Sequence, residues 1–202
     1  MSMFKPALAA AALVVAAVSA QASVTASTGA YSMSSFISLV SGGSSLGSVN
    51  NGGVYLDSFT DSGYAARPWS QADGYVTVGN WLAAGPSNVS TNATLTLGTG
   101  VTGVSFLWGS PDSYNSFSVT TNLGTTGFAP TDFGVTLDQD QTKAYYVKFS
   151  TSGESILSVN FMSTSNAIEI ANVAVVPEPE AYGLALAGLS IVGFALARRR
   201  KG

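Results

Sequence analysis

The chain has 202 residues, of which 46% are hydrophobic and 9% are charged, and its formal net charge is −3 at pH 7. A weakly acidic chain lacks the basic patches that neutralise phosphates, which argues against a nucleic-acid partner. The absence of Cys and His excludes disulfides, thiolate and imidazole metal sites, Ser-His-Asp or Cys-His catalysis and any histidine general base. The composition therefore favours a protein that is not an enzyme and needs no cofactor.

Residues 1–22 have the pattern of a secretory signal peptide. Residues 1–5 carry one positive charge, and an apolar run rich in Ala and Val follows over residues 6–20. Small residues at the −3 and −1 positions fit cleavage after Ala22, which we prefer, or after Ala20. We expect an N-terminal signal helix that is removed on export.

The remaining passenger, residues 23–175, has the length of one domain with its own core. Short runs of β-branched and aromatic residues alternate with Gly, Ser and Asn, which is typical of strands and tight turns. The expected strands are residues 52–59, 74–82, 93–97, 104–108, 114–120, 144–151, 156–162 and 167–175.

Alternation within these runs predicts the arrangement of the strands. In residues 75–78 and 116–119 the apolar side chains occupy every second position, so one face is expected to be buried and the Ser/Thr face wet. Residues 41–53 and 124–127 are predicted as loop and turn, and residues 32–40 show weak helical periodicity. The pattern predicts an all-β fold, an antiparallel β-sandwich of jelly-roll-like type, with a barrel as the alternative.

Residues 106–115 form the most distinctive internal segment. A strand leads into a turn with Asp112, and a second strand leaves from Tyr114. Trp108 and Tyr114 are candidate glycan contacts, because aromatic faces stack on sugar rings. The alternative, which we prefer, places Trp108 in the core and makes Asp112 a turn cap.

Two carboxylates, Asp138 and Asp140, stand two positions apart and are followed by Lys143. Carboxylates are hard oxygen ligands of the kind that calcium prefers, but a calcium site takes six to eight oxygens and this spacing lacks the Gly and closing Glu of an EF-hand. A solvated turn is the preferred interpretation, and a calcium site is the alternative.

The C-terminal residues 176–202 contain three parts in a fixed order. The first, residues 176–180, begins with Val176, Pro177, Glu178 and Pro179. The second, residues 181–197, carries no charge, and as a helix it would reach ~26 Å, just short of a ~30 Å hydrocarbon core. The third, residues 198–202, contains the basic residues Arg198, Arg199, Arg200 and Lys201. Positive residues resist translocation, so we expect a transmembrane helix with its basic tail in the cytoplasm and the passenger in the periplasm.

These three parts resemble the PEP-CTERM sorting signal of Gram-negative bacteria. The resemblance implies an exosortase partner, which is a membrane enzyme thought to cut near the Pro-Glu-Pro sequence and to pass the protein to the surface or the extracellular matrix. Residues 108–115 are also similar to a Trp-Gly-Ser-x-Asp-x-Tyr-Asn hairpin in exosortase-dependent surface proteins. Those relatives tend to carry Asp two residues after the glutamate that corresponds to Glu169, where this chain has Ala171. A calcium role for this closing strand is therefore in doubt.

Together these features predict a non-enzymatic surface or biofilm-matrix protein that is held transiently in the inner membrane and then displayed outside the cell. A carbohydrate-binding module, with exopolysaccharide as partner, is the first alternative; it rests on Trp108, Tyr114, Trp69 and Trp81. A permanently tail-anchored periplasmic protein is the second.

Overall fold

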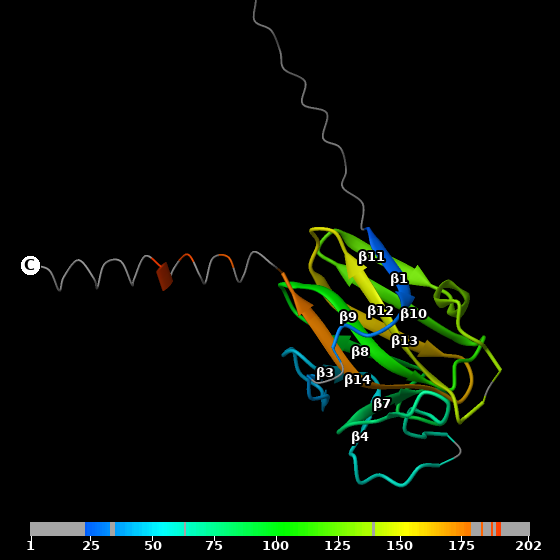
Figure 1. The fold of residues 1–202 in the computed structure, drawn as a ribbon. Coiled ribbons are helices and arrows are strands. Elements are labelled where there is room, and N and C mark those ends of the chain that lie inside the picture. The colour runs from blue at the N-terminus through cyan, green and yellow to red at the C-terminus, as the bar shows by residue number, and fades with distance from the viewer. Residues whose placement is uncertain are drawn as a thin grey trace, which may run out of the picture.

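The computed structural model describes residues 23–32, 35–62, 64–138 and 140–178, together with residues 183, 187, 189 and 190. The predicted signal helix and the predicted basic tail lie outside these residues. Within the described part, the strands form two six-stranded sheets and a small two-stranded ribbon (Figure 1). The all-β sandwich expected from the sequence is confirmed, as two facing sheets, and the jelly-roll-like connection stays a prediction.

The first sheet is antiparallel throughout. Its strands, in spatial order, are β1 (Val24–Thr28), β12 (Ala144–Thr151), β9 (Val101–Gly109), β14 (Ile168–Pro177), β7 (Trp81–Ala84) and β4 (Gly53–Tyr55). The register pairs Val24 with Thr151, and Gly103 with both Ser150 and Val176. The start of β1 and the end of β14 therefore lie at the same end of this sheet (Figure 1).

The second sheet covers one face of the first. In spatial order it contains β11 (Gly124–Phe128), β10 (Asn115–Thr121), β13 (Ile156–Ser163), β8 (Asn92–Thr96), β3 (Ser48–Asn50) and β2 (Val40–Ser41). The pair β2–β3 is parallel and the other pairs are antiparallel. A 3₁₀ turn, η1 (Pro130–Phe133), follows β11. The ribbon consists of β5 (Trp69–Ser70) and β6 (Tyr75–Val76).

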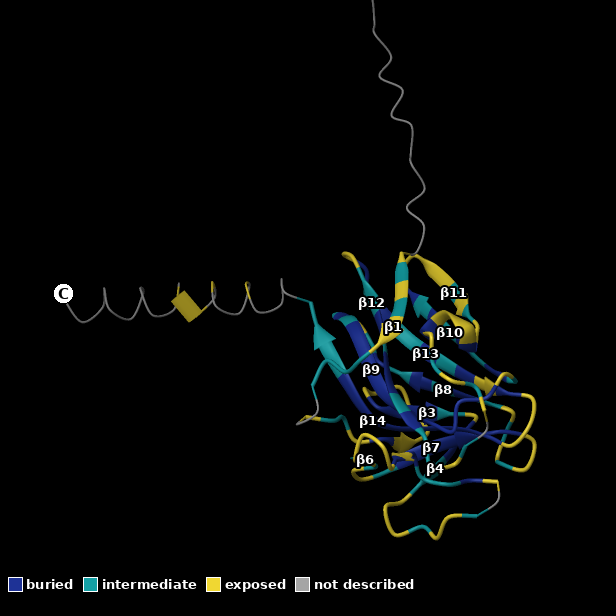
Figure 2. Cartoon of the chain, turned by 45° about the vertical axis from the view of Figure 1, so that its right-hand side comes forward, coloured by how far each residue is buried: buried dark blue, intermediate teal, exposed yellow. Residues whose placement is uncertain are grey.

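Aromatic side chains fill the space between the two sheets. Phe106 packs against Phe161 with ring centroids 5.1 Å apart, and Trp108 packs against Phe117 at 4.9 Å. Figure 2 shows buried residues gathered on β7, β9 and β14, with exposed ones on the loops and the edge strand β11. Each large apolar side chain contributes about 2 kcal/mol on full burial, so this cluster stabilises the fold of a chain that has no disulfides.

A second, smaller core lies on the other side of the first sheet. It is built from Ala65, Trp81, Ala83, Leu107, Ala144, Tyr146 and Ala171. The segment of residues 55–78 contributes Tyr55, whose ring stacks on Trp81 with centroids 4.6 Å apart, and Tyr75, which meets Tyr146 edge-on at 4.9 Å. Both faces of the sheet are thus covered, which explains why β7 is buried along its whole length.

Several sequence predictions need correction. Residues 41–53 are not one loop, since β3 lies within them, and residues 124–127 form most of strand β11. Residues 35–39 adopt no helix. The alternation in residues 116–119 is confirmed, whereas Val76 and Val78 are 62% and 56% exposed. In β6, Val76 points to solvent, because the inward side of this short strand is occupied by the half-buried Tyr75 and its contact with Tyr146.

Candidate functional site

The end of β14 is the point where the folded passenger meets the proline-acidic motif. Val176 is paired with Gly103, and Pro177 with Val101, so the first two residues of the motif are part of the sheet. Pro177 has no N–H to donate, which makes the last position of a strand a suitable place for it. Glu178, directly after the strand, donates its main-chain N–H to the carbonyl of Gly100 at 2.8 Å.

A ring of hydrogen bonds holds Glu178 against two loops, and we call Gly100, Ser155, Pro177 and Glu178 the sorting junction. The N–H of Gly100 donates to Ser155 Oγ at 3.2 Å, and the Ser155 hydroxyl donates to Glu178 Oε1. Gly100 has a φ of 78°, a conformation that favours glycine, and it turns both its N–H and its carbonyl toward the ring. Glu178 is half-buried.

Asn122 fixes the position of Ser155. Its side-chain Oδ1 accepts the N–H of Ser155 at 3.0 Å, and its own N–H donates to the carbonyl of Ser155 at 3.2 Å. Four segments that are distant in the sequence therefore meet at one end of the sandwich. The motif leaves the domain from this fixed point rather than from a free linker.

A family model of the PEP-CTERM protein-sorting motif matches residues 175–201. The chain carries a PEP-CTERM sorting signal. The match covers the motif, the uncharged segment and the basic tail that the sequence singled out, and it implies export and sorting of a surface protein by an exosortase. Searches of curated proteins and of solved structures find no match.

Most of the PEP-CTERM signal beyond Glu178 lies outside the described residues, including Pro179 and the basic residues 198–201. Gly183, Ala187, Leu189 and Ser190 are helical and exposed. In the described part of the chain, no helix is both long and apolar enough to cross a membrane. The predicted transmembrane helix at residues 181–197 stays a prediction.

The predicted glycan contacts are corrected in part. Trp108 is 0% exposed, and its Nε1 donates to Asn115 Oδ1 at 3.2 Å, so it offers no face to a sugar. Trp81 is also fully buried. Tyr114 is half-buried, donates its hydroxyl to the carbonyl of Asn166 at 3.0 Å, and has its pKa raised by burial. Trp69 is the one tryptophan that stays partly open, at 39%.

The two predicted calcium ligands, Asp138 and Asp140, form ion pairs with Lys143. Lys143 Nζ forms an ion pair with Asp138 and lies 3.6 Å from Asp140 Oδ2. Asp140 also caps the turn, since its Oδ1 accepts the N–H and the hydroxyl of Thr142 at 2.9 and 2.7 Å. These bonds, led by the one from the Thr142 hydroxyl, lower the pKa of Asp140. Among the residues that the structure describes, no group of three or more acidic side chains gathers as a metal site.

Two buried carboxyl groups were not predicted as a pair. Asp112 is 1% exposed and Glu169 is 4% exposed, and they come from the distinctive hairpin and the closing strand. Burial raises the pKa of Glu169 to about 8; the N–H of Ala66 lowers it, and the charges of Asp112 and Asp61 raise it. Burial likewise raises the pKa of Asp112. The space beside Glu169 is lined by residues 66–69, Gly109, Ser110 and Gln141, and it leaves no room for a water molecule.

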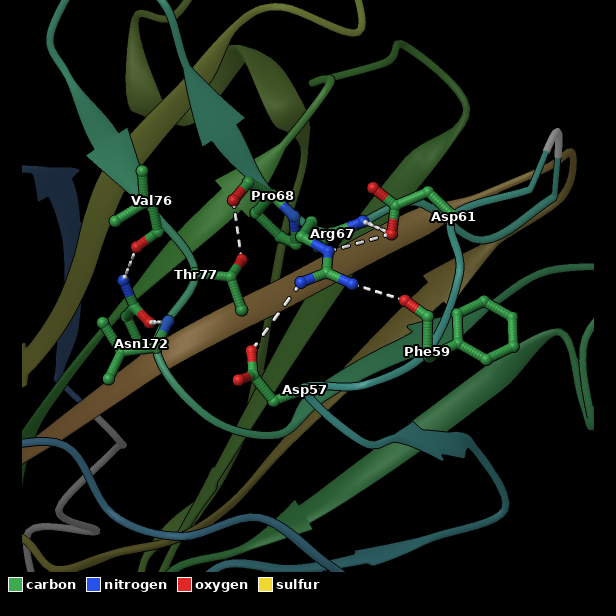
Figure 3. Close-up of polar contacts among 9 residues, drawn as sticks. Asp57, Phe59, Asp61, Arg67, Pro68, Val76, Thr77 and Asn172 are labelled. Atoms are coloured by element: carbon green, nitrogen blue, oxygen red, sulfur yellow. Dashed lines mark hydrogen bonds and ion pairs between the residues drawn. The ribbon is translucent and has the colours of Figure 1, made fainter.

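Residues 57–78, which include the residues 66–69 beside Glu169, form a cover that polar contacts hold in place (Figure 3). Arg67 donates through Nε to Asp61 at 3.1 Å, reaches Asp57 at 3.7 Å and donates to the carbonyl of Phe59. On the other side, Asn172 Nδ2 donates to the carbonyl of Val76 at 2.7 Å, and its Oδ1 accepts the N–H of Val78 at 2.7 Å. Arg67 thus braces the first part of the segment internally, and Asn172 fastens its last part to β14.

Proposed function

We propose that this chain is a non-enzymatic cell-surface or biofilm-matrix protein whose β-sandwich is the cargo of its PEP-CTERM signal. The observation that carries the proposal is the continuity of β14 with the signal, since the strand that closes the sandwich runs into the matched residues. Cleavage near the motif would thereby release the folded domain at a defined point.

The non-enzymatic role is supported by the chemistry of the passenger. The sequence has no Cys or His, so the usual nucleophile and base pairs are absent. The most buried acidic residues of the described chain are Asp112, Glu154 and Glu169, and residues 66–69 line the space beside Glu169. Acid–base catalysis requires carboxyl groups that reach a substrate, and these three are buried.

An outer surface of hydroxyl and amide groups suits a protein that works in a hydrated matrix. The outward positions of β10 are Ser116, Ser118 and Thr120, all half-exposed. Exopolysaccharide is the partner that we propose for this face, because hydroxyl-rich sugars exchange hydrogen bonds with such side chains.

The proposal is tested by following the chain in a Gram-negative host that has an exosortase. Wild-type protein is compared with a Pro177→Ala/Glu178→Ala/Pro179→Ala variant by mass spectrometry of the inner-membrane, surface and medium fractions. We expect the wild type to lose its C-terminal segment and reach the surface, and the triple variant to stay in the inner membrane at full C-terminal length.

A matched control is the Asp138→Asn/Asp140→Asn variant, which changes an exposed turn of the passenger and leaves the signal intact. It should be processed like the wild type. Equal processing of the triple variant and the wild type would refute sorting through this motif. Wild-type protein that keeps its tail in the presence of the exosortase would instead establish the tail-anchored alternative.

A further inference from the structure

Glu154 is a buried carboxylate whose hydrogen bonding is incomplete. It lies in the turn between β12 and β13 and is 4% exposed. Its Oε1 accepts the main-chain N–H of Ser23 at 2.6 Å, while Oε2 is buried and has no hydrogen-bond partner among the described residues. A buried carboxylate that receives a single neutral amide is poorly compensated for the water that it loses.

The partner of Glu154 is the residue at which the mature chain is expected to begin. Within the precursor, the nitrogen of Ser23 belongs to a peptide bond and carries one hydrogen. Hydrolysis of the Ala22–Ser23 bond by a signal peptidase consumes one water, leaves a carboxylate on Ala22 and frees the amino group of Ser23. With an ordinary pKa of about 8, this group is an ammonium at neutral pH, with a positive charge and three N–H donors.

We propose that Glu154 is the binding site for the α-ammonium group of a mature chain that begins at Ser23. The new charge lies within hydrogen-bond distance of Oε1, and the two additional donors supply what Oε2 lacks. Hydrogen bonds between two charged groups are about twice as strong as neutral ones. The ion pair therefore forms only after export and cleavage, and in this respect it rests on the proposed function.

The site distinguishes between the two candidate cleavage points. Cleavage after Ala20 leaves Gln21 and Ala22 ahead of Ser23, so the nitrogen next to Glu154 remains a neutral amide. Cleavage after Ala22 places the charge at the carboxylate.

The ion pair also secures an edge strand. In the sheet order, β1 pairs with β12 alone, and Val24, next to Ser23, is opposite Thr151. The Thr151 hydroxyl donates to the carbonyl of Glu154 at 2.5 Å and fixes the turn that carries the carboxylate. Binding of the ammonium group thus fixes the first residue of the mature chain to the turn after β12, the strand that pairs with β1 in the described sheet.

The first experiment reads the N-terminus of the full chain after export in its host. Sequencing and intact mass are expected to give Ser23 as the first residue. A mature protein that begins at Gln21 overturns the proposal. The same mass spectrum reports the C-terminal cut separately, so failure of sorting and failure of this inference give different results.

The second experiment measures thermal unfolding of four exported proteins: wild type, Glu154→Gln, Ala22→Leu and the double variant. Leucine at the −1 position moves cleavage to Ala20, which sequencing verifies, and leaves a two-residue extension. We expect each single variant to unfold about 2–4 °C lower than the wild type. The double variant should unfold at the same temperature as Glu154→Gln, because the extension then has no carboxylate ion pair to remove. Additive losses, or an extended protein as stable as the wild type, would overturn the proposal.

Discussion

Glu154 and Ser155 are consecutive in the chain, and each contacts one of the two segments at which the passenger begins and ends in the sequence. Glu154 accepts the N–H of Ser23, and Ser155 donates its hydroxyl to Glu178. One turn between β12 and β13 therefore touches both the expected signal-peptide boundary and the PEP-CTERM motif. Folding of this turn therefore brings the expected signal-peptide boundary and the sorting motif to the same end of the sandwich.

The contact between Ser155 and Glu178 should slow exosortase processing. The enzyme has to bind the motif in its own site, so the bonds of the sorting junction must open first, and affinity falls with the fraction of open molecules. Replacement of Ser155 by Ala removes two half-buried hydrogen bonds, the one from the Gly100 N–H and the one to Glu178. The bond that holds Glu178 is worth about 1 kcal/mol. We expect the cleaved fraction in a pulse-chase experiment to appear roughly 2- to 5-fold faster.

The control for this prediction is Ser118→Ala, which removes a hydroxyl from the outward face of β10, away from the sorting junction. Its processing rate should equal that of the wild type. Slower cleavage of Ser155→Ala would mean that the exosortase recognises the motif in its docked form.

Glu169 should make the protein less stable as the pH rises. The folded state holds this carboxyl protonated up to a pKa of about 8, whereas in the unfolded chain the ordinary value is 4.5. Between these values the unfolded state binds fewer protons, so the free energy of unfolding falls with increasing pH and levels off above pH 8. The full effect is roughly 4 to 5 kcal/mol at about 1.4 kcal/mol per pH unit.

Denaturant unfolding of the exported protein at pH 5 and pH 8 checks this prediction. Glu169→Gln, which mimics the neutral acid, should lose most of the difference between the two pH values. Any slope of the same sign that remains would come from Asp112, whose pKa is also raised by burial. An unchanged slope in Glu169→Gln would contradict the assignment to this residue.

The acidic turn at Asp138 and Asp140 should behave as a surface ion pair. Lys143 already pairs with both carboxylates, and ion pairs this exposed contribute little to stability. We expect Asp138→Asn/Asp140→Asn to unfold within about 2 °C of the wild type, both with calcium and with a chelator. A rise in the melting temperature with calcium that this variant lacks would instead establish the metal site.

The strands that the sequence predicted well are those whose pattern is decided by one buried face. In β10, Phe117 and Val119 alternate with hydroxyl residues, and the structure buries them as expected. β3 was missed because it is short and carries Ser and Asn, and β11 because Gly and Thr dominate it. Their strand conformation comes from ladder pairing with β8 and β10 rather than from their own side chains.

The sorting signal was predicted from three ordered sequence parts, but its contacts were not. Gly100, Asn122 and Ser155 are ordinary loop residues in the sequence. The register of β9 and β14 brings Gly100 to Glu178, and the turn after β12 brings Ser155, which Asn122 holds from the turn after β10. Likewise, Trp108 and Tyr114 stand close in the sequence, yet β9 directs Trp108 into the core. Side-chain direction at a strand end depends on the neighbouring strands, which periodicity alone does not reveal.

Asn172 should be critical for the cover formed by residues 57–78. It interrupts β14 with a φ of 52°, and its amide bonds the main chain of Val76 and Val78 and the hydroxyl of Tyr146. Replacement by Ala leaves buried groups unpaired and strains the positive φ, which should lower the free energy of unfolding by about 2–4 kcal/mol. Asn172→Gly keeps the backbone relaxed and should lose less stability.

Both Asn172 variants should become sensitive to chymotrypsin at Trp69. The control is Asn160→Ala, which removes a hydrogen bond to Thr94 in the second sheet and should leave the resistance unchanged. If chymotrypsin cuts wild type and Asn172→Ala at equal rates, the cover is held by its aromatic packing on Trp81 and Tyr146 alone.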